Sequence, residues 1–150
     1  MMDARSLRNV QTLLPRMQEK AGEWYAKCRA AGLNVVVICG TRTYQEQENL
    51  YAIGRTKLGK KVTNARGGYS NHNFGIAFDF VIFDGVDEEG GTGKALWDSP
   101  DMAKAGKVAE ELGLEWGGNW KFYDAPHIQA KTGKTLAQLR DLIKKGQPII

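Results

Sequence analysis

The stretch SNHNFGIAFDF, residues 70–80, decides how the middle of this chain folds. In its second half, large apolar residues alternate with small or acidic ones, namely Gly75, Ala77 and Asp79. A period of two residues predicts a β-strand with one apolar face, here over residues 74–83. Asp79 then shares the opposite face with Gly75 and Ala77, whose small size leaves room beside the sheet.

Another strand and three helical segments are predicted before this stretch, the first of them short and around residues 6–14, SLRNVQTLL. Residues 34–40, NVVVICG, are β-branched and bounded by glycine, which predicts a buried strand. Residues 15–32 repeat apolar side chains every three or four positions, which is typical of a helix packed on a core. Thr43 and Glu46 have capping-box spacing, so a helix begins after the strand and Arg42 lies at the junction.

The rest of the chain predicts shorter elements. Residues 54–71 lack an apolar period and are rich in Gly, Lys, Asn and Arg, which indicates a long surface loop that can border a cleft. The later patterns predict a polar turn, a helix, two short antiparallel strands and a final helix, in that order, at residues 84–94, 98–113, 114–120, 126–130 and 134–146. Terminal helices around several strands predict one compact α+β domain over residues 1–150.

Composition narrows the class of protein. With 150 residues the chain can bury a core of its own. No apolar run approaches the ~20 residues of a membrane span, and the start MMDARSLRNV lacks the apolar core of a signal peptide. We therefore expect a cytoplasmic protein without membrane insertion, in which Cys28 and Cys39 stay reduced. The net charge of +4 favours an anionic partner but does not select one.

The two histidines of the chain, His72 and His127, each have an aspartate nearby. Asp79 follows His72 in the predicted strand, and Asp124 precedes His127, with Pro126 between them. A catalytic zinc typically takes three His or carboxylate ligands and leaves one position for water. A further carboxylate beside a ligand suits the general base of metal-assisted hydrolysis. The alternative is that each residue is structural, although an aspartate buried in a strand is costly without a partner.

These residues resemble a family of zinc peptidases that includes D-alanyl-D-alanine carboxypeptidases and dipeptidases, and phage endolysins acting as L-alanyl-D-glutamate endopeptidases. The family pattern SxHxxGxAxD is matched by Ser70, His72, Gly75, Ala77 and Asp79. Its second block, an acidic residue two before a Pro-His pair, is matched just after GGNW by Asp124, Pro126 and His127. GTRTYQEQ, residues 40–47, resembles the family segment that carries an arginine facing the substrate.

The resemblance implies an α+β peptidase fold that holds one Zn²⁺ through three ligands: His72, Asp79 and His127. It implies that Asp124 is the general base and that Arg42 stabilises the oxyanion of the tetrahedral intermediate. Ser70 is expected to bind the substrate backbone. Trp120 is a candidate for stacking on substrate, with a cleft-wall or core position as the alternative.

Small members of this family with GTRTYQEQ and GGNW features are similar to phage endolysins that cut the L-Ala–D-Glu bond of the peptidoglycan stem peptide. The resemblance implies a monomer that accumulates in the host cytoplasm, reaches the wall when a holin permeabilises the membrane, and lyses the cell. A positive charge favours an anionic wall. Two alternatives remain open: a D-Ala-D-Ala carboxypeptidase or dipeptidase, and a non-catalytic module that binds wall peptides.

Two charged segments have competing interpretations. The acidic residues Asp84, Asp87, Glu88 and Glu89 resemble a regulatory Ca²⁺ site of some endolysins, but their spacing is not an EF-hand and a solvated turn is favoured. The basic stretch at residues 55–66 has no interleaved aromatic residues for base stacking, so no nucleic acid is expected as a partner.

Overall fold

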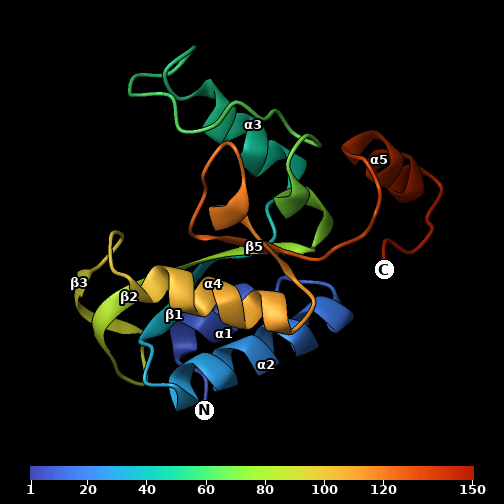
Figure 1. Ribbon diagram of the computed structural model, residues 1–150. Coiled ribbons are helices and arrows are strands. Elements are labelled where there is room, and N and C mark those ends of the chain that lie inside the picture. Colours follow the sequence, from blue (N-terminus) through green and yellow to red (C-terminus); the bar gives the residue numbers. More distant parts are fainter.

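A five-stranded antiparallel sheet runs through the molecule, which a computed structural model describes over residues 1–150 (Figure 1). The order along the sheet is β1-β2-β5-β4, and β3 pairs with β2 beyond this path. The strands are β1 (Val35–Cys39), β2 (Ala77–Val86), β3 (Gly91–Ala95), β4 (Glu115–Trp116) and β5 (His127–Gln129). The expected α+β class is confirmed.

Helices cover both faces of the sheet. They are α1 (Ala4–Val10), α2 (Pro15–Ala30), α3 (Tyr44–Ala52), α4 (Asp101–Glu111) and α5 (Leu136–Lys144), with short 3₁₀ turns η1 (Asn71–Phe74) and η2 (Gly117–Asn119). In the view of Figure 1, α1, α2 and α4 lie below the sheet, and α3 and α5 lie above it. None of these helices is both long and apolar enough to cross a membrane.

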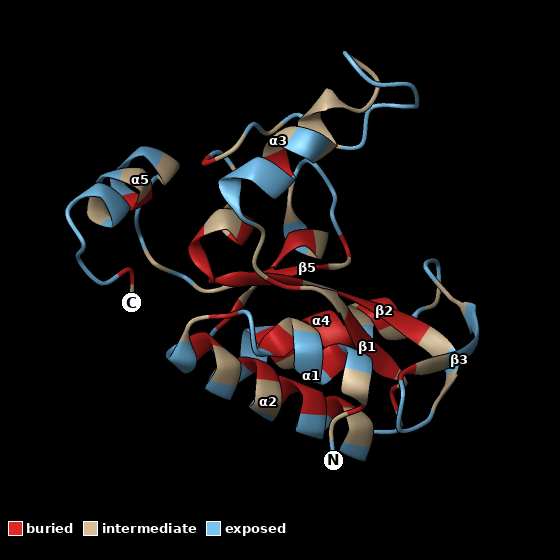
Figure 2. Ribbon diagram, turned by 180° about the vertical axis from the view of Figure 1, so that it is seen from behind, coloured by how far each residue is buried: buried red, intermediate tan, exposed pale blue.

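The main core lies between the sheet and the layer of α1, α2 and α4, where Figure 2 shows the buried faces turned toward each other. Trp24 of α2 is fully buried there, and its ring centroid lies 5.1 Å from that of Phe78 and 5.0 Å from that of Phe80. Its indole N–H donates to the carbonyl of Ala105. The aromatic residues of β2 therefore face the core, as the alternation predicts, and Asp79 faces the other side.

The start of β2 differs from the prediction. The alternation predicts a strand from residue 74, whereas Asn71–Phe74 forms η1 and the strand begins at Ala77. The amide oxygen of Asn73 accepts the backbone N–H groups of Gly68 and Ser70, which holds the chain in a turn. Gly75 follows with a φ of 73°, in the left-handed region that favours glycine. The chain thus bends at Gly75 before it enters the sheet.

The predicted polar turn at residues 84–94 is also partly wrong. β2 continues as far as Val86 and forms a hairpin with β3, in which Val86 pairs with Gly91. Cross-strand hydrogen bonds override the poor strand propensity of these glycine-rich and acidic residues.

The carboxylates of this hairpin give the Ca²⁺ interpretation no support. Asp87 Oδ1 accepts the backbone N–H groups of Glu89 and Gly90, and Asp84 Oδ2 accepts that of Lys94. No group of three potential metal-ligating side chains forms here. These carboxylates stabilise the turn through backbone hydrogen bonds instead.

Most other elements agree with the predictions. Thr43 and Glu46 form both hydrogen bonds of the capping box at the start of α3. β4 and β5 pair antiparallel, and the helix predicted at residues 98–113 is α4. Neither Cys28 nor Cys39 forms a disulfide.

Candidate active site

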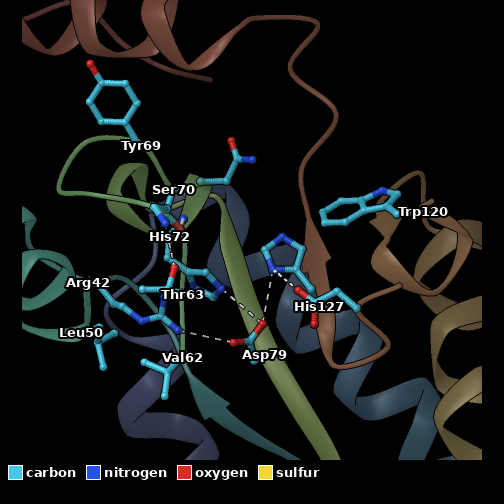
Figure 3. A pocket seen from close by; sticks show the side chains of 13 residues that line it. Arg42, Leu50, Val62, Thr63, Tyr69, Ser70, His72, Asp79, Trp120 and His127 are labelled. Carbon is cyan, nitrogen blue, oxygen red and sulfur yellow. Dashed lines mark hydrogen bonds and ion pairs between the residues drawn. The ribbon is translucent and has the colours of Figure 1, made fainter. Parts of the chain in front are cut away.

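Asp79 lies at the centre of the site. It lies directly opposite His127 in the pairing of β2 with β5, so both side chains project from the same face of the sheet. His72 comes from η1, which the bend at Gly75 brings back over the strand. Asp79 Oδ1 is 3.2 Å from His72 Nε2 and 3.3 Å from His127 Nδ1 (Figure 3). One carboxylate oxygen therefore contacts both imidazoles.

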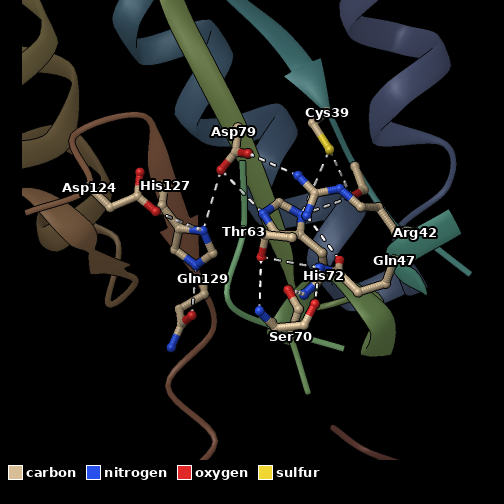
Figure 4. A network of polar contacts seen from close by, with 12 residues as sticks. Cys39, Arg42, Gln47, Thr63, Ser70, His72, Asp79, Asp124, His127 and Gln129 are labelled. Atoms are coloured by element: carbon tan, nitrogen blue, oxygen red, sulfur yellow. Dashed lines mark hydrogen bonds and ion pairs between the residues drawn. The ribbon is translucent and has the colours of Figure 1, made fainter. Parts of the chain in front are cut away.

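The remaining nitrogen of each imidazole has its own hydrogen-bond acceptor. His72 Nδ1–H donates to the carbonyl of Gly40 over 2.9 Å. His127 Nε2–H donates to Gln129 Oε1 over 2.7 Å (Figure 4). Such bonds fix the ring orientation and the tautomer of a histidine. They leave His72 Nε2 and His127 Nδ1 directed at Asp79.

The distances from Asp79 to the two histidines fit ligands of one zinc ion. Two ligand atoms 2.0–2.1 Å from a tetrahedral zinc lie about 3.3–3.4 Å apart, close to both histidine–Asp79 distances. Cys39 also lies near, and its donor atom lies within 4.8 Å of those of His72 and Asp79. However, Cys39 Sγ approaches His72 at Nδ1, at 4.0 Å, where the Gly40 carbonyl already binds. Asp79 meets the other nitrogen of this ring, Nε2, so Cys39 and Asp79 approach His72 from different sides.

The charges of the site are tightly coupled. Burial alone raises the pKa of Asp79, but hydrogen bonds from His127 and His72 outweigh it and hold that pKa well below its usual range. Burial lowers the pKa of His72, and the hydrogen bond to Asp79 and its charge reverse this effect, raising the pKa to about 10. A metal ion that binds here must therefore displace the proton of His72.

Arg42 lies beside this cluster. Its Nη2 is 3.6 Å from Asp79 Oδ2, and its backbone N–H donates to the carbonyl of His72. Its Nη1 donates to Gln47 Oε1 over 3.2 Å. Gln47 is fully buried on α3, and its Nε2 donates to the carbonyl of Ala65. Gln47 thus links Arg42 to the loop that walls the pocket.

Asp124 lies at the edge of the cluster, with Oδ2 3.9 Å from His127 Nδ1. Its side chain is 49% exposed, so it reaches both solvent and the site. Partial burial raises its pKa, the negative charge of Asp79 adds to this, and the positive charge of the neighbouring histidines opposes it. A carboxylate with a raised pKa in contact with solvent suits proton transfer to and from water.

The two predicted substrate contacts also line the pocket. The ring of Trp120 lies 5.0 Å from that of His127, and its indole N–H donates to Glu115 Oε2 over 2.9 Å. Ser70 caps η1, and its hydroxyl oxygen accepts the backbone N–H of His72. Ser70 therefore has a structural function as well, which its place in the sequence pattern does not reveal.

A cavity of about 430 Å³ opens over these groups (Figure 3). The loop at residues 54–71 forms one wall, as predicted, through Val62, Thr63, Ala65, Tyr69 and Ser70. Asn71, at the end of this loop, also lines the cavity, and the remaining lining residues are Arg42, Leu50, His72, Asp79, Trp120, Asp124 and His127. All seven residues singled out from the sequence, Arg42, Ser70, His72, Asp79, Trp120, Asp124 and His127, lie in this one cavity.

Sequence reasoning missed Gln47 and Gln129. Both lie close in sequence to the recognised motifs, since Gln47 ends GTRTYQEQ and Gln129 lies two residues after His127. A side chain two residues along a strand lies on the same face, which is a signal that points to Gln129. The interior position of Gln47 depends on how α3 packs against the loop, and no local pattern reveals it.

An α+β fold with two imidazoles and a carboxylate converging in an open pocket, beside a second carboxylate and a guanidinium, defines the class of mononuclear metallohydrolases. Residues 63–130 match a family model of M15 peptidases described as D-alanyl-D-alanine carboxypeptidase. Across 127 residues the chain is 38% identical to the peptidoglycan L-alanyl-D-glutamate endopeptidase CwlK of Bacillus subtilis strain 168, covering 78% of this chain and 72% of that protein. The chain belongs to the M15 family of zinc peptidases.

The chain is also similar to two further proteins. The L-alanyl-D-glutamate peptidase of Listeria phage A118 is 29% identical over 127 residues, covering 84% of this chain and 41% of that protein. The crystal structure of the L-Ala D-Glu endopeptidase ChiX of Serratia marcescens superimposes with a TM-score of 0.61 at 24% identity, covering 88% of this chain and 90% of that one. The second similarity supports the fold.

Proposed function

We propose that the protein is a zinc-dependent endopeptidase that hydrolyses the L-Ala–D-Glu bond of the peptidoglycan stem peptide. The observation that carries the proposal is the contact of one Asp79 oxygen with both His72 and His127 inside the pocket. The activity named for the relative from Bacillus subtilis supports the choice of bond.

In this proposal His72 Nε2, Asp79 Oδ1 and His127 Nδ1 hold the metal. A bound zinc supplies Lewis acidity to the scissile carbonyl and lowers the pKa of a water molecule. Asp124 takes the proton of the attacking water and passes it to the leaving amine, a function that its raised pKa and half-exposed position favour.

Arg42 stabilises the negative charge that develops on the carbonyl oxygen. Its guanidinium carries five N–H donors, and only two of its nitrogens contact Gln47 and Asp79, so donors remain for substrate. The bond to Gln47 holds the guanidinium in place before the substrate arrives, which is what makes a fixed cation effective in catalysis. Ser70 and Trp120 contact the peptide on the pocket walls.

The cellular setting forms part of the same proposal. The protein is proposed to be an endolysin that acts as a monomer on the bacterial wall and lyses the cell, after a holin releases it from the host cytoplasm. The L-alanyl-D-glutamate peptidase activity named for the phage relative supports the action on wall peptides. The net charge of +4 assists binding to an anionic wall. We do not propose a nucleic acid or the interior of a membrane as a partner.

A second candidate is removal of terminal D-Ala, as the description of the matched family model names a D-alanyl-D-alanine carboxypeptidase. A module that only binds wall peptides is less favoured, because binding alone has no use for a carboxylate beside the metal site at the position of Asp124.

The test is digestion of purified peptidoglycan by the purified protein, before chelation, after chelation and after zinc is restored. Mass spectrometry of the products separates the candidates: a new N-terminal D-Glu supports the endopeptidase, and free D-Ala supports the carboxypeptidase. Peptidoglycan that yields neither product with the zinc-loaded protein would contradict both enzymatic functions.

A further inference from the structure

We propose that Gln129 is a positioning residue that selects the nitrogen through which His127 binds the metal. This inference rests on the zinc site of the proposed function. The two residues lie at positions i and i+2 of β5, so both side chains lie on the same face of the strand. His127 Nε2 and Gln129 Oε1 are 2.7 Å apart, the shortest contact that either imidazole of the site makes.

The geometry of this bond determines the tautomer. A neutral imidazole carries one N–H, and an amide oxygen can only accept a hydrogen bond. The bond to Gln129 Oε1 therefore places the proton on His127 Nε2. In the neutral ring that a metal requires, Nδ1 then keeps its lone pair, and in the metal-free protein this atom lies 3.3 Å from Asp79 Oδ1. A half-turn of the ring about its Cβ–Cγ bond would put Cδ2 in the place of Nδ1, so a C–H group without a lone pair would face the metal position.

The two histidines of the site direct different ring nitrogens at Asp79. His72 presents Nε2 and donates Nδ1–H to the backbone carbonyl of Gly40, an acceptor that every side-chain substitution retains. His127 presents Nδ1 and depends on the side chain of Gln129. The orientation of His127 is therefore the one that a substitution can release.

The sheet holds Gln129 in place. Its backbone pairs with Ala77 of β2 on one side and with Glu115 of β4 on the other. Gln129 lines a second cavity of about 640 Å³ together with Lys131 and Asn71. Asn71 lines both cavities. A side chain in this position meets the imidazole from the side away from Asp79.

The test compares zinc affinity in three variants by competition with a chelator of known affinity. Gln129→Met keeps the length of the side chain but has no strong acceptor, and we expect zinc affinity to fall by about 10- to 100-fold, the usual effect of losing such a partner. Gln129→Glu keeps the acceptor, and we expect affinity equal to or above that of the unaltered protein. Gln45→Met, on the exposed face of α3, is the matched control and should change nothing.

A spectroscopic measurement separates positioning from a general structural effect. In the zinc-loaded protein the imidazole ¹⁵N shifts should show Nδ1 coordinated and Nε2 protonated for His127. Gln129→Met should lose this signature and Gln129→Glu should retain it. Thermal unfolding in excess chelator checks that each variant still folds.

Two results would overturn the inference: unchanged zinc affinity in Gln129→Met, or an equal loss in Gln129→Glu and Gln129→Met. Wall digestion is recorded separately with the unaltered protein. If the variants change zinc affinity as expected but the unaltered protein releases no D-Glu product, only the proposed function is contradicted. If the unaltered protein releases D-Glu product but Gln129→Met binds zinc with unchanged affinity, only the inference is contradicted.

Discussion

Asp79 and His127 are paired residues of adjacent antiparallel strands, and their side chains meet at 3.3 Å on the face of the sheet away from the core. Because His72 reaches the same Asp79 oxygen from η1, the site joins two strands and the turn before one of them. Each of these side chains can be replaced separately, and the following predictions state the expected results.

Asp79→Ala should abolish stoichiometric zinc binding, because it removes the one group that contacts both histidines. Metal analysis of the purified, zinc-loaded protein after gel filtration measures this. Asp98→Ala, at an exposed aspartate, serves as the control and should retain the metal. Retention of bound zinc by Asp79→Ala would show that another donor set, such as one containing Cys39, holds the ion.

Asp124→Asn should keep zinc and lose turnover, because this side chain lies next to His127 without sharing the Asp79 contact. General acid–base catalysis contributes typically about 10²- to 10⁴-fold, so the rate of wall digestion should fall by that factor. Parallel metal analysis provides the control. Normal digestion by a variant that holds zinc would exclude Asp124 as the base.

The metal-free protein should lose stability as the pH rises from 6.5 toward 10. The pKa of His72 is raised from 6.5 to about 10 in the fold, so the fold binds a proton that the unfolded chain releases in this interval. The stabilisation is complete below pH 6.5 and disappears as the pH passes the folded value. Urea unfolding in chelator at several pH values measures it.

Asp79→Asn is the control for this pH dependence, because the carboxylate is what raises the pKa of His72. The variant should show a flatter dependence over the same interval. Zinc affinity of the unaltered protein should change in the opposite direction and rise with pH, since zinc must displace the His72 proton. A zinc affinity independent of pH would refute this coupling.

Trp24→Ala should destabilise the fold by about 3–5 kcal/mol, the usual cost of truncating a buried large aromatic side chain. Trp24 is fully buried against Phe78 and Phe80, and these residues belong to the strand that carries Asp79. Equilibrium urea unfolding measures the change in the free energy of unfolding. Trp97→Ala, at a tryptophan that is 50% exposed, should cost far less.

The fold class could be predicted from the sequence because its signals are local. The period of two in β2 and the capping box at Thr43 and Glu46 each involve residues only a few positions apart. The start of β2 could not be predicted, because the side chain of Asn73 accepts two backbone N–H groups and holds η1 where the alternation predicts a strand. The β2–β3 hairpin was missed because pairing outweighed weak strand propensity.

The site residues could be named from motif spacing, but their supporting contacts could not. The carbonyl of Gly40 contacts His72, and the side chain of Gln47 contacts Arg42. Both contacts depend on how β1 and α3 pack, which no local sequence pattern specifies. Gln129 alone was within reach of sequence reasoning, since strand geometry places it on the face of His127.

The proposed zinc site also links metal binding to the register in which β5 pairs with β2. If β5 slipped by one residue against β2, His127 would turn into the core and Ile128 would take its place beside Asp79, because side chains alternate along a strand. A chain with this error lacks a complete ligand set. In the proposed zinc site, the ion would therefore bind only chains with the correct register and shift the folding equilibrium toward them.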